Sequence, residues 1–200
     1  MKFLIFPVLA LLLISFAGCG SSREVSRVSP DTVTDITGRW NDTDSRLTAE
    51  EMITDVLKKN WLTDFMTAKS KKPTVIVGTI RNKSSEHIAT DVFIKDIERE
   101  LVNSGKVTIV ADKTVRDDVR DERQDQRENA SLETMKQFYK ELGADFFLVG
   151  VVNSIEDSFD GEKVLFYQVD LELINIETNE KVWLSNKKIK KVIEQKKSGW

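Results

Sequence analysis

The chain is poor in the side chains that most metal and catalytic sites require. It contains one cysteine, Cys19, and one histidine, His87. This pair falls short of the four ligands of a structural zinc site, and a single cysteine cannot form an intramolecular disulfide. Residues 157–162 hold several carboxylates but lack the ligand spacing of a calcium loop. Asp160 and Gly161 within them predict a hairpin turn instead. The composition therefore argues against a metalloprotein.

An excess of charge of one sign is also missing. The 30 basic and 33 acidic residues give a net charge of −3. A general nucleic-acid-binding protein carries a strong basic excess, so we expect no nucleic-acid partner. Glycine-rich phosphate loops are missing too. Gly78 and Gly150 stand singly in apolar stretches, where glycine marks a bulge or a close backbone approach.

The longest apolar run lies at the N-terminus, where residues 3–16 follow the basic Lys2 and precede two small residues. This order is typical of a secretory signal, and the run is shorter than the roughly 20 residues of a membrane-spanning helix. Residues 16–19, Phe-Ala-Gly-Cys, resemble the bacterial lipobox, in which a signal peptidase cuts before a diacylglycerol-bearing cysteine. We therefore expect residues 1–18 to be removed and Cys19 to carry an N-acyl diacylglycerol, with no other cofactor.

The residues after the cysteine indicate where the protein is anchored. Gly20 stands where an aspartate would resemble the inner-membrane retention signal. We therefore expect a lipid anchor at the periplasmic face of the outer membrane. Residues 19–46 contain few large apolar groups, which predicts a lipidated N-terminus and flexible tether. The alternative for its last part is that residues 35–47 are ordered against the domain. Residues 47–200 then form one globular domain.

Hydrophobic periodicity predicts the elements of this domain. A helix over residues 48–65 begins with a capping box formed by Thr48 and Glu51. Two further helices are expected: one has Thr90 as its N-cap and ends near Gly105, and the other runs from Ser131 to near Gly143. Strands are expected at residues 74–80, 107–111, 146–155, 164–174 and 182–189, with period-two alternation in the fourth. The fold class is α/β, a mixed four- to five-stranded sheet with helices mainly on one face, in the order α-β-α-β-α-β-β-β.

Two stretches are candidates for binding a partner. If residues 112–129 form a helix, one face of it carries four arginines: Arg116, Arg120, Arg123 and Arg127. A row of arginines suits an acidic partner, and the alternative is a solvated helix. Arg81 and Asn82, after the first strand, are the second candidate.

A catalytic interpretation has little support. Ser84, Ser85, His87 and Asp91 lie in one loop, but a Ser-His-Asp relay needs a base positioned between the nucleophile and the orienting group. Residues so close in one loop rarely adopt that geometry, and the sequence lacks a nucleophile-elbow pattern. We therefore predict no enzyme and no small-molecule substrate, with a hydrolase as an alternative.

Several stretches together resemble a known family. They are residues 35–47 (DITGRWNDTDSRL), 75–88 (VIVGTIRNKSSEHI), 101–107 (LVNSGKV), 141–146 (ELGADF) and 166–175 (FYQVDLELIN), followed by Trp183. From about residue 35 to residue 191, in order, the chain resembles the LpoB family of outer-membrane lipoproteins that activate a penicillin-binding protein.

The resemblance implies both a fold and a partner. The fold would be related to the N-terminal domain of TolB, on a tether. The partner would be a bifunctional glycosyltransferase–transpeptidase, which a monomeric protein would bind and stimulate. An alternative is a structural or assembly lipoprotein similar to CsgG. That function would need an added hairpin with about ten residues of apolar-out alternation per strand, and the sequence shows no spare hairpin of this kind.

Overall fold

The computed structural model describes residues 24–129 and 141–194. The chain divides into two units, residues 1–32 and 33–200, and the described helices and strands all lie in the second. In the first unit, the Thr32 N–H donates to the Ser29 carbonyl at 3.0 Å and closes a turn. None of the described helices is long and apolar enough to cross a bilayer. Cys19, the signal sequence and most of the helix expected from Ser131 lie outside the described residues.

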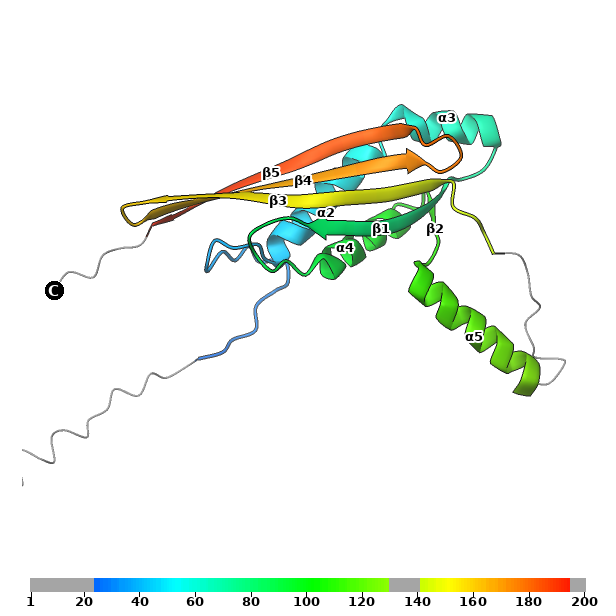
Figure 1. The fold of residues 1–200 in the computed structure, drawn as a ribbon, viewed down its shortest axis with the longest axis horizontal. Coiled ribbons are helices and arrows are strands. Elements are labelled where there is room, and N and C mark those ends of the chain that lie inside the picture. The colour runs from blue at the N-terminus through cyan, green and yellow to red at the C-terminus, as the bar shows by residue number, and fades with distance from the viewer. Residues whose placement is uncertain (1–23, 130–140, 195–200) are drawn as a thin grey trace, which may run out of the picture. The chain divides into compact units, whose positions relative to one another are not determined.

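A five-stranded mixed sheet forms the framework of the second unit, with the spatial order β2-β1-β3-β4-β5 (Figure 1). β1 (Thr74–Asn82) runs parallel to β2 (Thr108–Ile109) on one side and to β3 (Phe146–Phe159) on the other. β4 (Glu162–Asn175) is antiparallel to β3 and to β5 (Lys181–Glu194). These pairings confirm the predicted α/β class and mixed sheet.

Two helices cover one face of this sheet. α2 (Asp42–Val56) packs on β5, α4 (Thr90–Asn103) packs on β1, and the two helices contact each other. α3 (Asn60–Lys69) follows α2 and brings Trp61 against Phe146 of β3. α5 (Lys113–Asn129) comes after β2 and contains no buried residue. The expectation that helices lie mainly on one face is therefore confirmed.

The core lies between the sheet and the two helices. β4 supplies it by period-two alternation, which turns every second side chain to the same face. The buried side chains of β4 are Leu165, Tyr167, Val169, Leu171 and Leu173. They meet buried residues of α2 and α4, among them Met52, Ile53, Phe93 and Ile97. The alternate residues of β4 face away from the helices, as the sequence predicts.

The first helix begins earlier than predicted. Its N-cap is Asn41, whose side chain accepts from the Asp44 N–H at 3.1 Å while the Asp44 carboxylate accepts from the Asn41 N–H at 3.0 Å. This is a capping box with aspartate in the place of the usual Glu or Gln. Around this helix, the usual pattern of Thr or Ser followed three residues later by Glu occurs only at Thr48 and Glu51, which explains the later predicted start. Thr48 lies buried inside α2. Residues 35–46, assigned to the tether, therefore belong to the folded domain.

Smaller differences concern other boundaries. The expected single helix over residues 48–65 is divided into α2 and α3. The N-cap of α4 is Ala89 rather than Thr90. β3 and β5 extend well beyond their predicted ends, whereas β2 is shorter. The hairpin turn at Asp160 and Gly161 is confirmed, with φ of 45° and 86°.

Gly150 in β3 provides a test of the packing between β3 and β4. A Cβ at this position would lie 2.6 Å from the Asp170 carbonyl oxygen and would also meet the Leu171 side chain. We expect Gly150→Ala to lower the free energy of unfolding by roughly 1–3 kcal/mol through overpacking. Gly143→Ala is the matched control, because a Cβ there meets nothing within 4 Å. Urea unfolding measures both, and equal stability of the two variants would contradict the packing.

Candidate functional site

The arginine row predicted on α5 is present on a helix, but two of its members are held by a carboxylate. Arg120 donates through Nε and Nη2 to Glu141 at 2.8 and 2.7 Å. Arg123 lies 3.7 Å from the same carboxylate. The hydrogen bond with Glu141 raises the pKa of Arg120, and it lowers the pKa of Glu141. This part of the row therefore presents paired rather than free cations to a partner.

The two end members of the row have different surroundings. Arg116, near the start of α5, donates through Nη1 to the Ala111 carbonyl at 3.2 Å. Its Nε is buried and finds no hydrogen-bond partner among the described residues. Arg127 lies in the last turn of the helix. The four arginines thus share a helix face without sharing an environment.

Asn82, the second predicted candidate, organises the loop between β1 and α4. Its Oδ1 accepts from the Ser84 N–H at 2.9 Å and from the Ser84 hydroxyl at 2.6 Å, and its Nδ2 donates to the Glu86 carbonyl at 2.7 Å. The Ser85 hydroxyl lies 3.3 Å from the hydroxyl of Ser154. In the described chain neither serine hydroxyl is hydrogen-bonded to the exposed His87. The loop therefore does not assemble the serine–histidine pair that the hydrolase alternative requires.

Residues 35–41, which we call the N-terminal strap, close over this loop. The Trp40 N–H is 3.2 Å from Glu86 Oε2 and 3.1 Å from the Tyr167 hydroxyl oxygen, both of which can accept from it. The Trp40 ring packs edge-on against Tyr167 and Phe93, at centroid distances of 5.6 and 6.1 Å. Burial, followed by the hydrogen bond to Glu86, raises the pKa of Tyr167 above its ordinary range. Three segments distant in sequence thus meet around one buried tyrosine.

Lys191 of β5 fastens the strap to the start of α2. Its Nζ donates to Asp35 at 2.5 Å, to Asp44 at 2.6 Å and to the Arg39 carbonyl at 3.3 Å. The side chains of Lys191 and Asp44 are only 10% and 8% exposed. Burial lowers the pKa of Lys191, but the bonds and charges of the two carboxylates outweigh it and raise the pKa overall. The hydrogen bond from Lys191 also lowers the pKa of Asp35.

Sequence reasoning placed the strap in the tether; it left open that residues 35–47 are ordered against the domain but did not identify these contacts. Two signals could have revealed them: the Asn41–Asp44 capping pair, and an isolated Trp40 in a polar stretch. The carboxylates of Asp35 and Asp44 are occupied by an ammonium group. Among the residues that the structure describes, no cluster of three or more His, Cys, Asp or Glu is arranged to hold a metal.

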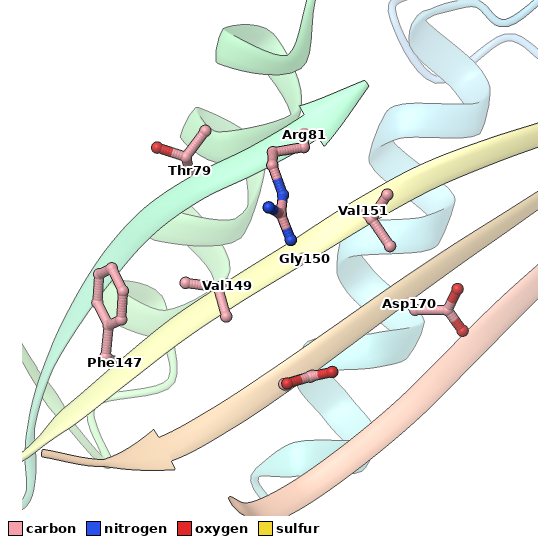
Figure 2. Close-up of a pocket in the computed structure, with 8 residues that line it drawn as sticks. Thr79, Arg81, Phe147, Val149, Gly150, Val151 and Asp170 are labelled. Atoms are coloured by element: carbon pink, nitrogen blue, oxygen red, sulfur yellow. The ribbon is translucent and has the colours of Figure 1, made fainter. Parts of the chain in front are cut away.

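The sheet face turned away from α2 and α4 carries a groove of about 300 Å³. Apolar side chains of β3, Phe147, Val149 and Val151, form its floor (Figure 2). The Arg81 side chain extends from β1 toward β3 above this floor (Figure 2). Glu172 at the groove pairs with Lys181 at 2.7 Å. Arg81 makes no ion pair within the described residues and is therefore available to a partner on this face.

Comparisons with known proteins give one family. Residues 44–189 match the family model described as the peptidoglycan-synthase activator LpoB. Similar solved structures include the LpoB C-terminal domain from Salmonella enterica, with 14% identity, 76% of this chain and 99% of that chain covered, and a TM-score of 0.39. The corresponding Escherichia coli domain has 12% identity and a TM-score of 0.43, with 73% of this chain and 98% of that chain covered. Lipoprotein GNA1162 from Neisseria meningitidis has 12% identity and a TM-score of 0.41, with 63% of this chain and 88% of that chain covered. No curated protein sequence matches.

The strap contact can be tested at Lys191. We expect Lys191→Met to lower the free energy of unfolding by about 3 kcal/mol, because it leaves the buried Asp44 carboxylate without its counter-charge. Lys187→Met is the matched control on the same strand. The Lys187 partner, Glu51, is 61% exposed, so that pair contributes only about 0–1 kcal/mol. Urea unfolding measures both variants, and a loss for Lys191→Met no larger than the control's would contradict the contact.

The contact between Lys191 and Asp35 also predicts how the stability of the domain depends on pH. The pKa of Asp35 is lowered in the folded state, so its stabilising effect is present above about pH 3.8 and is lost as the pH falls through the folded value. The pKa of Lys191 is raised, so its effect is lost as the pH rises beyond 10.5. We expect the wild type to lose stability more steeply than Lys191→Met at both the acidic and the alkaline end of the pH range. Parallel curves from urea unfolding across pH would disprove this.

Proposed function

This chain belongs to the LpoB family of peptidoglycan-synthase activators, and we propose that it binds a bifunctional penicillin-binding protein and stimulates it. The match of the family model over residues 44–189 carries the proposal. The matched range runs from the first turn of α2 into β5 and includes most of the domain. The family is regulatory, and the engaged hydroxyls of Ser84 and Ser85 are consistent with binding rather than catalysis.

The proposed anchor sets how far the domain can act from the membrane. We propose that the mature protein begins at Cys19, bears an N-acyl diacylglycerol there, and is held at the periplasmic face of the outer membrane. Because the strap begins at Asp35, the tether is residues 19–34 rather than 19–46. A tether of 34 − 18 = 16 residues spans at most roughly 55 Å when fully extended. The synthase must therefore come within this distance of the anchor plus the size of the domain.

An activator that does no chemistry itself can stimulate an enzyme by binding one of its states in preference to another. The activator shifts a conformational equilibrium by as much as its affinities for the active and inactive forms differ. A tenfold shift needs about 1.4 kcal/mol of differential binding. A few contacts that exist only in the active form of the synthase are enough to supply this amount. Stimulation should accordingly saturate with activator concentration.

The proposal predicts a gain of synthase activity in a purified system. We expect the soluble mature chain, residues 20–200, to raise glycan polymerisation or crosslinking by the cognate bifunctional synthase severalfold. Both rates are measured with lipid-linked substrate at increasing activator concentration. Val169→Asp is the control, because a carboxylate at this fully buried position of β4 prevents folding. Unchanged rates at saturating wild-type protein would refute the function.

A further inference from the structure

The lysines of the edge strand β5 fall into two groups. Lys181, Lys187 and Lys191 each pair with a carboxylate of the domain. Lys188 and Lys190 form no ion pair in residues 24–129 and 141–194, and both are exposed. They alternate with half-buried residues that face the helices, so they point to the helix-free face. Two cations are thus left unneutralised on one face of one strand.

Apolar side chains of β3, β4 and β5 that are exposed or half-buried lie beside these lysines. Lys190 is opposite Phe166, which is itself opposite Ile155. Ile155 is 65% exposed, and Val192, two residues beyond Lys190 on the same face of β5, is 55% exposed. β3, β4 and β5 run on past the helices at this end of the sheet (Figure 1). Arg81 of β1 lies on the same face. We name this surface the open-face patch, and it consists of Arg81, Ile155, Phe166, Lys188, Lys190 and Val192.

Solubility alone does not account for this combination. Lysine on an edge strand discourages association with another sheet, but the exposed Ile155 and the half-buried Phe166 beside it favour association. Exposed apolar groups framed by polar ones mark interaction surfaces, and unpaired charges give such a surface its complementarity and orientation. The patch therefore fits a partner that offers apolar groups together with carboxylates.

A protein fits this patch better than an anionic lipid surface does. Glu162 and Glu194 lie opposite each other at the tip of the same strands, next to Phe159. Anionic headgroups would attract the lysines but would be repelled by these two carboxylates. A protein partner can place carboxylates at Lys188 and Lys190 and avoid them at the tip.

We propose that the open-face patch is the docking surface for an acidic, partly apolar surface of the synthase. This inference rests on the proposed function and adds to it the surface and the chemistry of the contact. The arginine row of α5 is a poorer dock, because Arg120 and Arg123 would have to give up Glu141 to bind new carboxylates. The lysines of the patch have no such bond to lose.

The test compares variants of equal charge in the soluble mature chain. We expect Lys188→Glu/Lys190→Glu to weaken binding to the purified cognate synthase at least tenfold, and Ile155→Asp to do the same. Lys58→Glu/Lys106→Glu, exposed lysines away from the patch, is the matched control and should bind as the wild type does. Biolayer interferometry at two salt concentrations measures the Kd, and circular dichroism checks folding.

The outcomes separate the patch from the function. Weaker binding by the patch variants with an unaffected control supports the patch. Wild-type affinity in the patch variants, or equal losses in patch and control variants, overturns it while the activator function stands. Patch variants that lose only binding to phosphatidylglycerol vesicles overturn it in favour of a membrane contact. A wild type that neither binds nor stimulates the synthase overturns the function and the patch together.

Discussion

The buried hydroxyl of Tyr167 is the contact on which the rest of the domain depends. The side chain lies at the centre of the alternating face of β4 and is fully buried. A buried hydroxyl without a hydrogen bond is costly, and the partners of this one come from Trp40 in the strap and Glu86 in the loop. The core of the sheet is therefore complete only when the strap and the loop are both in place. This requirement explains why the folded domain begins before its first helix.

Helices on a single face determine what the other face can do. Side chains alternate along a strand. The alternation that buries Leu171 and Leu173 of β4 against the helices therefore turns Asp170 and Glu172 outward. On β3 the outward residues at the groove, Phe147, Val149 and Val151, are apolar and form its floor. The helix-free face is thus neither a second core nor a uniformly charged surface. A mixed surface of this kind suits a reversible protein contact, whose centre is apolar and whose rim is polar.

The sequence predicted the parts that depend on local pattern and missed those that depend on distant residues. The alternation of β4 and the Asp160–Gly161 turn follow from spacing and from backbone preference, and both are confirmed. The strap depends on Lys191, which contacts Asp35 across 156 positions of the chain, and no local pattern contains that pairing. Glu141 lies outside α5, so the neutralisation of Arg120 was equally invisible. A row of charges in sequence becomes a binding surface only where folding leaves the charges unpaired.

The two sides of β5 connect the proposed anchor to the proposed contact. Lys191 points to the helix side and holds the strap, whereas its neighbour Lys190 points to the helix-free side and belongs to the patch. Consecutive residues of a strand face opposite ways, so the strap is fixed on one side of β5 and the patch is presented on the other. A pull on the tether is received by the strap through Lys191 and the Tyr167 cluster. The patch can therefore stay exposed to a partner when the proposed lipid anchor pulls on the chain.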